Sequence, residues 1–286
     1  VGLTALSAIT TGDHNVAIGY GAMDAVTEGY SSVGIGTNAL GAMTTHGQNV
    51  AIGYEALKGV TGSYYGNVGI GYVAGSNIVS GSGNICIGDE ALCGSTYWNT
   101  IIGTFAGHSA NTGGENVFVG VHAGSVATSG DQNVYVGGYA GHASTTGNEN
   151  TIMGYQAGLS ITEGTKNVCA GYNSGNSITT GDNNIIIGNE AGITGSPGGE
   201  ISTADNEICL GDENISAANI QVDWTIASDK RDKTDVNPMD LGLEFINKLE
   251  PVTYRWDKRS KYNKDQSVVP DGTHKEEQLE GGFLAQ

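Results

Sequence analysis

A glycine that closes a short apolar phrase recurs along the first 211 residues with a nearly constant spacing. The phrase reads NVAIGY at residues 15–20 and 49–54, and near copies follow, such as NVGIGY at 67–72 and NIIIGN at 184–189. Successive spacings of this closing glycine are 17, 17, 18, 17, 15, 17, 17, 17, 17, 17 and 23 residues. A period held this closely identifies the structural unit of the chain. The closing glycines are Gly19, Gly36, Gly53, Gly71, Gly88, Gly103, Gly120, Gly137, Gly154, Gly171, Gly188 and Gly211.

Each repeat predicts one coil of a β-solenoid. An Asn usually stands four residues before the closing glycine, and the residues between them, often β-branched as in Val16 and Ile18, predict a short inward-facing strand. Stretches such as TTG and TSG predict corners with positive φ angles and hydrogen bonds from side chains to the backbone. Seventeen residues are too few for a helical hairpin repeat. We therefore expect residues 1–227 to form an all-β shaft of about twelve coils, with GSPGG at 195–199 as a loop.

A coil of this length supplies few apolar side chains, and many of them are Ala, Gly or Val. Burying so few apolar groups contributes little free energy compared with the conformational entropy cost of folding, roughly 1–2 kcal/mol per residue. We therefore expect a homotrimer in which three chains share a core along a threefold axis, with a monomeric solenoid as the alternative. Near-identical coils make a slip of 17 residues almost neutral in pattern, so a separate element must fix the register of the three chains.

The phrases NVAIG at 15–19 and SSVGIG at 31–36 resemble the head repeats of trimeric autotransporter adhesins, whose units form a parallel β-roll. The resemblance implies a trimeric β-roll with an adhesive role. Those heads generally use shorter coils, so the 17-residue period departs from their pattern.

Charge divides the chain into two chemically different segments. Residues 229–286 hold 10 of the 12 Lys and Arg, whereas the first 228 residues carry 2 basic and 18 acidic side chains. We place the domain boundary between residues 227 and 228. The net charge of −18 argues against nucleic acid and anionic membranes as partners. No stretch approaches the ~18 apolar residues of a membrane span, and we read the chain as a fragment of a longer protein.

Cysteines are the first candidate chemical groups of the shaft. Cys86, Cys169 and Cys209 each stand two residues before the closing glycine, inside the apolar phrase. Five coils separate Cys86 from Cys169, roughly 24 Å at the spacing of stacked strands, which is too far for a disulfide. We expect small buried thiols at these positions, and the alternative is contact between copies of one cysteine at a trimer axis.

Histidines and acids are the other candidates. His108 and His142 share a phase of the repeat, and we expect exposed corner residues there, with a metal on a threefold axis as the alternative. Glu190 and Glu213 would stack on neighbouring coils, a separation that loosely suits a retaining glycosidase. A solvated acidic face explains acids in the phase of the repeat more simply. The sequence lacks a calcium-binding nonapeptide, a nucleotide-binding motif and a Ser-His-Asp arrangement, so we predict no cofactor and no bound metal.

The last residues carry a different pattern, which begins with SDKRDK at 228–233. Asn237 followed by Pro238 predicts the start of a helix. PVTYRW at 251–256 alternates like a strand, and GGFLAQ at 281–286 predicts the opening of another. The pieces SDKRDK, LEPVTYRW at 249–256 and GGFLAQ occur in this order around the helix. Together they closely resemble the C-terminal intramolecular chaperone of bacteriophage endosialidases, tail spikes and tail fibres.

That resemblance implies an α+β domain, partial here at 228–286, that trimerises and directs folding of the β-rich stalk before it. It also implies removal of the domain by autoproteolysis, although some members keep it attached. The cut would fall between Ser228 and Asp229, with Lys233 as the assisting amine. A serine hydroxyl needs a base, and lysine can serve when its pKa is lowered. The family usually has an apolar residue where Asp232 stands.

We therefore predict a segment of a phage tail fibre or tail spike, located in the virion tail. As a homotrimer it would attach to a host cell-surface glycan or protein receptor. Its predicted catalysis is at most one cleavage of its own chain. Two alternatives remain, a bacterial trimeric surface adhesin and a tail spike that depolymerises glycans.

Overall fold

The computed structural model describes residues 1–45, 47–61, 65–109, 112–218, 251–254 and 280–283. Its internal contacts divide the chain into two units, Val1–Asn219 and Ile220–Gln286, and each unit is considered by itself. The expected boundary between residues 227 and 228 and the expected helix after Asn237 lie outside the described residues.

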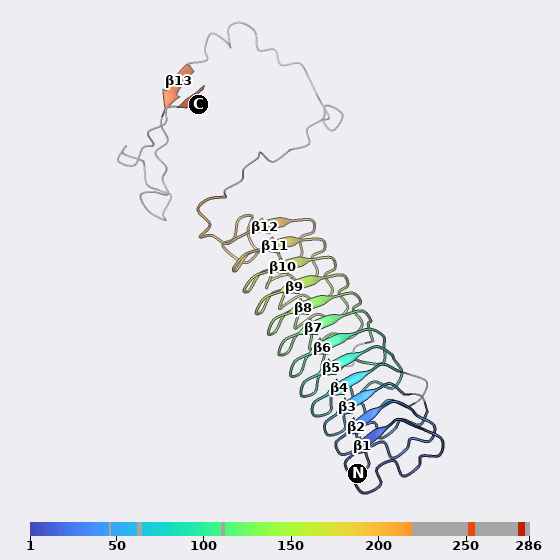
Figure 1. Cartoon of the computed structure of the whole chain (residues 1–286). Coiled ribbons are helices and arrows are strands. Elements are labelled where there is room, and N and C mark those ends of the chain that lie inside the picture. The colour runs from blue at the N-terminus through green and yellow to red at the C-terminus, as the bar shows by residue number, and fades with distance from the viewer. Residues whose placement is uncertain (46, 62–64, 110–111, 219–250, 255–279, 284–286) are drawn as a thin grey trace, which may run out of the picture. The chain divides into compact units, whose positions relative to one another are not determined.

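The first unit is a rod of stacked coils, each of which contributes one three-residue strand to a parallel sheet (Figure 1). Strands pair in chain order and in register, so that Val117 lies opposite Val134 one repeat later. The predicted all-β solenoid is confirmed. The strands are β1 (Val16–Ile18), β2 (Val33–Ile35), β3 (Val50–Ile52), β4 (Val68–Ile70), β5 (Ile85–Ile87), β6 (Thr100–Ile102), β7 (Val117–Val119), β8 (Val134–Val136), β9 (Thr151–Met153), β10 (Val168–Ala170), β11 (Ile185–Ile187) and β12 (Ile208–Leu210).

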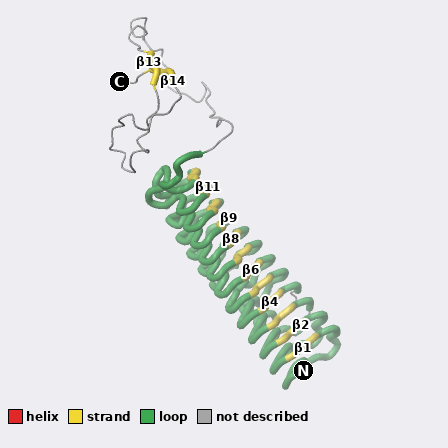
Figure 2. Tube along the Cα trace, turned by 60° about the vertical axis from the view of Figure 1, so that its left-hand side comes forward, coloured by secondary structure: helices red, strands yellow, loops and turns green. Residues whose placement is uncertain are grey.

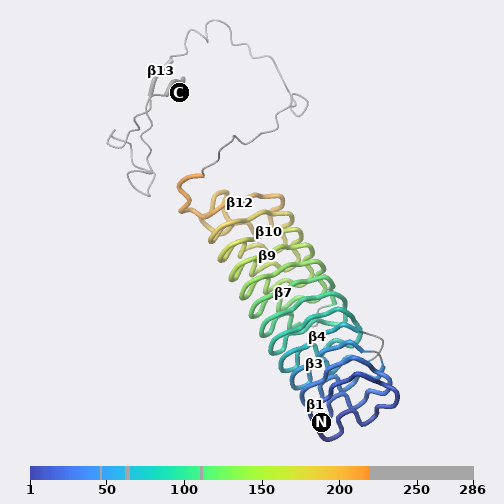
Figure 3. Tube along the Cα trace, viewed as in Figure 1, coloured from blue at the N-terminus to red at the C-terminus, as the bar shows by residue number. Residues whose placement is uncertain are grey.

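Most of each coil is turn, and the strands form one row along the rod (Figure 2). The turns are also bonded from coil to coil, as in Met23 N to Ala39 O at 2.9 Å and Gly124 N to Ala140 O at 3.0 Å. Every coil therefore follows the outline of the one before it, and the chain advances steadily along the rod (Figure 3). This repeated backbone bonding explains how a unit with so little regular strand forms an ordered stack.

Only the middle residue of each strand points into the coil. In β7 the side chain of Phe118 is fully buried, whereas Val117 and Val119 on either side are half-buried. Side chains alternate between the two faces of a strand, so a three-residue strand has one inward position and two outward ones. The expectation that the whole apolar phrase faces inward is therefore wrong, because β-branched residues such as Val16 and Ile18 point outward.

Two columns of side chains fill the interior: the central residues of the strands, and the residues four positions after the closing glycines. Along the rod, the large side chains shift from the second column to the first. In the early coils the strand centre is small and the residue four after the closing glycine is large, so Gly34 leaves room for Met23. Later the sizes reverse, and a Cβ on Gly124 would lie 2.7 Å from ring atoms of Phe118. This complementarity gives a single chain a continuous buried core from Ala17 to Cys209.

The closing glycine is required both by its backbone angle and by its neighbours. From Gly19 to Gly188 its φ lies between +129° and +142°, a region that is essentially restricted to glycine. A Cβ on Gly137 would also lie 2.4 Å from the carbonyl oxygen of Gly154 in the next coil. The 17-residue period of the sequence therefore marks the position at which the backbones of neighbouring coils approach each other most closely.

The corners differ from expectation in where the positive φ angles fall. Gly147 has no positive φ, and its role is close approach, since a Cβ there would lie 2.4 Å from the carbonyl oxygen of Gly164. The positive φ falls two residues later, on Glu149 at 56°. Threonine hydroxyls donate to the next coil, as in Thr145 Oγ1 to Thr162 O at 3.0 Å. The predicted bonds from corner side chains to the backbone are thus confirmed.

The long spacing before Gly211 is a surface loop, as predicted. Gly195, Gly198 and Gly199 have φ values of 98°, 85° and 91°, and Cβ atoms on the last two would meet nothing within 4 Å. The loop folds on itself through Gly199 N donating to Ser196 O at 2.8 Å.

In the second unit the described residues form an antiparallel pair, β13 (Pro251–Tyr254) and β14 (Glu280–Phe283). Pro251 pairs with Phe283 and Tyr254 with Glu280. Both strands were predicted, at 251–256 and from residue 281, and both are confirmed.

Candidate functional site

One face of the rod carries the outward side chains of the strands, most of which are apolar. We call the first and third residues of β1 to β12 the outer strand face; Val16 is 46% exposed and Ile208 is 59% exposed. A large apolar surface of this kind marks an interaction site on a soluble protein. The most exposed large residues of this face are Val16, Ile18, Ile52, Met153, Ile185, Ile187, Ile208 and Leu210.

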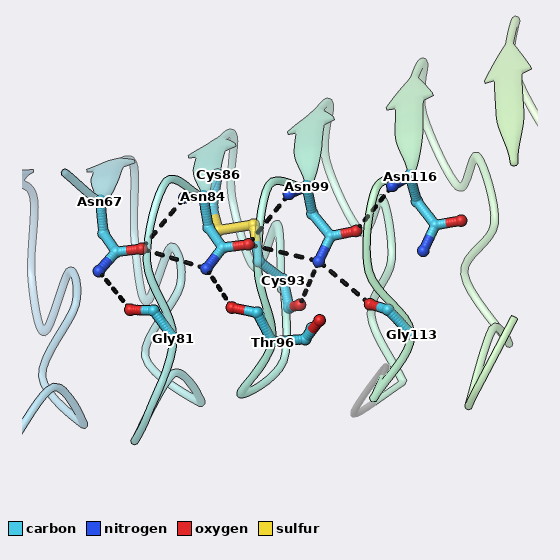
Figure 4. The surroundings of a disulfide bond; sticks show 9 residues. All are labelled: Asn67, Gly81, Asn84, Cys86, Cys93, Thr96, Asn99, Gly113 and Asn116. Atoms are coloured by element: carbon cyan, nitrogen blue, oxygen red, sulfur yellow. Dashed lines mark hydrogen bonds between the residues drawn. A yellow bond between two sulfur atoms is a disulfide. The ribbon is translucent and has the colours of Figure 1, made fainter. Parts of the chain in front are cut away.

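Buried asparagines stand beside the strands and link successive coils (Figure 4). Asn84 Oδ1 accepts the backbone N–H of Asn99 at 3.1 Å, and Asn84 Nδ2 donates to Thr96 O at 2.7 Å. The same nitrogen donates to Asn67 Oδ1 at 3.1 Å. The sequence showed the phase of these residues but not this bonding. We call the set the Asn ladder: Asn49, Asn67, Asn84, Asn99, Asn116, Asn133, Asn150, Asn167 and Asn184.

A disulfide joins Cys86 to Cys93 in the interior of the fifth coil (Figure 4). Their Cα atoms are 6.1 Å apart and seven residues separate them along the chain. The expectation of a free thiol at Cys86 is wrong, because the cysteine close enough to bond lies in the same coil and outside the strand phase. Cys169 and Cys209 are free and buried, as predicted.

Reducing the disulfide is expected to lower the free energy of unfolding by about 2–3 kcal/mol, the magnitude expected for closing so short a loop. Urea unfolding of the protein with and without dithiothreitol measures this difference. The double variant Cys86→Ser, Cys93→Ser serves as the control and should respond equally in both conditions. Equal stability of the oxidised and reduced wild type would contradict the bond.

A buried thiol and a buried tyrosine hydroxyl make the stability of the rod depend on pH in the alkaline range. Burial raises the pKa of the Cys169 thiol to about 12 and that of the Tyr135 hydroxyl to about 12. Tyr135 donates to Ser144 Oγ at 2.8 Å and stacks on Phe118 at 4.8 Å between ring centroids. Both groups therefore stay protonated in the folded rod at a pH where an unfolded chain would lose the protons.

The free energy of unfolding is expected to fall as pH rises from about 9 towards 12. The folded state binds more protons than the unfolded state in this window, so the slope is negative, up to about 1.4 kcal/mol per pH unit for each group. Well below the ordinary thiol pKa of 9.0, these two groups leave the stability unchanged. Urea titrations of Cys169→Ala and Tyr135→Phe should show a shallower alkaline slope than the wild type. An unchanged slope in both variants would exclude these groups as its source.

Aromatic rings outside the strands stack on one another from coil to coil. Phe105 stacks on His122 at 5.2 Å between centroids, His122 on Tyr139 at 5.0 Å, and Tyr155 on Tyr172 at 5.9 Å. The rings of each pair stack face to face, and Tyr155 and Tyr172 are each 47% exposed. We take this arrangement as support of one coil by the next.

The two predicted histidines contact the same series of stacked rings, His108 through Phe105 and His142 through His122. His108 is exposed, as predicted, and lies 3.4 Å from Glu90. His142 is half-buried against His122, and burial lowers its pKa. Glu190 is half-buried and Glu213 is exposed. Within residues 1–218 and the other described segments, no group of three or more His, Cys, Asp and Glu could hold a metal ion. The described part of the chain contains no helix that is long and apolar enough to cross a membrane.

The predicted catalytic residues Ser228, Asp229 and Lys233 lie outside the described residues. Their roles stay a prediction from the sequence.

Comparisons with known proteins bear on the same terminal segment. Residues 228–286 match the family described as the chaperone of endosialidase. Neither the curated proteins nor the solved structures give a match to the chain. A β-solenoid shaft followed by a match to this chaperone family is consistent with a structural protein of the tail-fibre or tail-spike kind.

Proposed function

We propose that the chain is part of a homotrimeric phage tail fibre or tail spike that attaches a virion to a host surface. Residues 228–286 act as a chaperone for their own chain. The observation that carries the proposal is the match to the endosialidase chaperone family directly behind a β-solenoid. That family is associated with trimer formation.

The outer strand face supports self-association. Twelve in-register strands line up their outward side chains in one row, and large apolar residues of β1, β3, β9, β11 and β12 are exposed there. Bringing three such faces together would bury this apolar area, which contributes about 25 cal/mol per Å². The repeated coils leave the axial register of three chains undetermined, and a trimeric end domain would fix it.

Aspartates on the outer strand face are expected to disrupt the trimer. In the double variant Ile185→Asp, Ile187→Asp, two half-exposed apolar side chains become charged, and a threefold axis would bring six carboxylates together. Val79→Asp, Val121→Asp is the matched control, with exposed valines outside the strands. Light scattering of the full chain should give a trimer for the wild type and control only. A monomeric wild type, or a trimeric strand-face variant, contradicts this assembly.

Autoproteolysis is the second part of the proposal. Hydrolysis of the Ser228–Asp229 bond, with Lys233 as base, would release the chaperone after folding. Mass spectrometry of the full-length protein should show a break after Ser228 that Ser228→Ala and Lys233→Ala abolish. An intact wild-type chain contradicts the protease role and leaves the chaperone as a permanent part of the trimer.

A further inference from the structure

One corner of the rod changes its chemistry over three coils. We call the two residues before each position of the Asn ladder the corner column. Most of its residues are polar, as in Asp131–Gln132 and Asp182–Asn183, but the fourth to sixth coils carry aromatic residues and glycines. These are Tyr65, Gly66, Ser82, Gly83, Tyr97 and Trp98.

The six residues line an open groove of about 440 Å³, within the range of about 300–1,000 Å³ typical of small-molecule sites. Trp98 is 65% exposed, Tyr65 54% and Tyr97 48%. Single rings such as Tyr20 and Tyr72 are as exposed elsewhere on the rod, but here three rings line one concave site.

Glycines and backbone bonds hold the aromatic rings in place. A Cβ on Gly83 would lie 2.7 Å from Trp98 Cδ1, so the indole rests against bare backbone. Gly83 N donates to Tyr65 O at 3.2 Å, and Trp98 N donates to Ser82 O at 3.1 Å. The site is therefore organised before any ligand binds, which limits the conformational entropy lost on binding.

A polar hollow follows in the next two coils of the same column. Its volume is about 280 Å³, and it is lined by Gly114, Glu115, Asp131 and Gln132. Glu115 N donates to Tyr97 O at 3.1 Å, which joins the hollow to the aromatic groove. Gln132 Nε2 donates to Glu115 Oε2 at 2.9 Å and orients that carboxylate. Ionised carboxylates are strong acceptors for hydroxyl donors.

Charge restricts what can bind here. Lys58 and Lys166 are the sole basic side chains before residue 229, and neither lines the groove or the hollow. An anionic ligand would meet Glu115 and Asp131 without a compensating cation. A ligand that contacts every part of both sites, from Tyr65 to Gln132, spans four coil steps, roughly 19 Å, which is longer than a single sugar or a small cation.

We infer that the groove and the hollow together bind a neutral oligosaccharide that runs along the rod. The apolar C–H face of a pyranose ring would stack on Trp98, flanked by Tyr65 and Tyr97, while hydroxyls donate to Glu115 and Asp131. The aromatic stretch is bounded by polar Gln48 and Glu115 in the same column. It is thus much smaller than the roughly 800 Å² per partner of a stable protein interface.

This inference rests on the proposed attachment role and names its ligand class. The test is binding of the full chain to immobilised neutral hexose and N-acetylhexosamine oligomers, with sialylated and sulfated oligomers as the anionic arm. We expect binding to neutral oligomers, a loss of at least tenfold in affinity for Trp98→Ala, and a change of only a few-fold for Trp98→Phe. Tyr172→Ala removes a ring of similar exposure on another part of the coil and should leave affinity unchanged.

Ligand length separates the two hollows. Affinity should rise from disaccharides to hexasaccharides, and Glu115→Ala should weaken hexasaccharide binding several-fold while disaccharide binding stays the same. Equal loss for both lengths would contradict a ligand that extends along the rod.

Other outcomes overturn the inference or the role beneath it. Three results would show that the groove does not bind a neutral glycan. They are unchanged binding in Trp98→Ala, a preference of the wild type for anionic oligomers or small cations, and loss of self-association in Trp98→Ala. Attachment of Trp98→Ala to host cells at wild-type levels would exclude the groove but keep the attachment role. Wild-type protein that binds no cells of any tested host would contradict the attachment role itself.

Discussion

Replacing Gly137 with alanine is expected to divide the rod into two blocks that unfold separately. The φ of +135° at this position costs an L-residue about 1–3 kcal/mol. The new Cβ would also lie 2.4 Å from Gly154 O, so the eighth and ninth coils must move apart. A repeat protein gains its stability from contacts between neighbouring units, so a weakened interface in the middle uncouples the two sides. We expect a total loss above about 4 kcal/mol.

Urea unfolding followed by circular dichroism should show one transition for the wild type and two for Gly137→Ala. Hydrogen exchange should locate the loss of protection at Val134–Val136 and Thr151–Met153. Gly138→Ala is the matched control, because Gly138 has no positive φ and its Cβ would lie 3.3 Å from the Tyr155 ring and 3.9 Å from Val121 O. A single, unshifted transition in Gly137→Ala would show that the closing glycine is not needed for stacking.

Asn133→Ala is expected to destabilise the rod by about 2–5 kcal/mol. The Asn133 side chain donates to Asn116 Oδ1 at 3.2 Å and to Gly147 O at 2.8 Å. It accepts the backbone N–H of Asn150 at 3.0 Å and its Nδ2–H at 3.2 Å. Alanine removes all four bonds. It leaves the buried Gly147 O and Asn150 N–H of the next coil without these partners, which costs more than losing a surface bond would.

The chain itself offers the control for this experiment. Ser32 occupies the ladder position of the second coil, and its hydroxyl accepts the backbone N–H of Asn49 at 3.2 Å. Asn133→Ser should therefore recover part of the stability lost in Asn133→Ala, as measured by urea unfolding. Gln132→Ala changes the exposed neighbour and should stay within about 0.5 kcal/mol of the wild type. Equal losses for the alanine and serine variants would exclude the ladder bond as the cause.

The architecture could be predicted because the closing glycines mark every coil. Their spacing predicts about twelve stacked coils and the loop around GSPGG, and the resemblance to the adhesin head repeats adds the parallel arrangement. The strands at 251–254 and 280–283 followed from alternation and from the resemblance to the chaperone family. These features depend on local pattern alone, which a single sequence contains.

Features that depend on contacts across the coil could not be predicted. Three-residue strands are too short for alternation to show which residue faces inward, so Val16 and Ile18 were assigned to the wrong side. Cys93 stands outside the strand phase, and nothing in the sequence placed it 6.1 Å from Cys86. The site formed by the exposed rings of Tyr65, Tyr97 and Trp98 could not be predicted because the rings come together from two coils, the fourth and the sixth.

The large interior side chains come from different columns in the first and second parts of the rod, and this limits how such a shaft can lengthen. The first three coils supply the large interior residue from one column, as Met23 does beside Gly34, and coils from the sixth supply it from the other, as Phe118 does beside Gly124. The Cys86–Cys93 disulfide lies in the fifth coil, between these two packing types. Duplicating a coil within either block preserves the match of large and small residues, whereas transferring one across the disulfide creates a void or an overlap. Insertion or deletion of whole coils is therefore permitted on each side of the fifth coil and penalised across it.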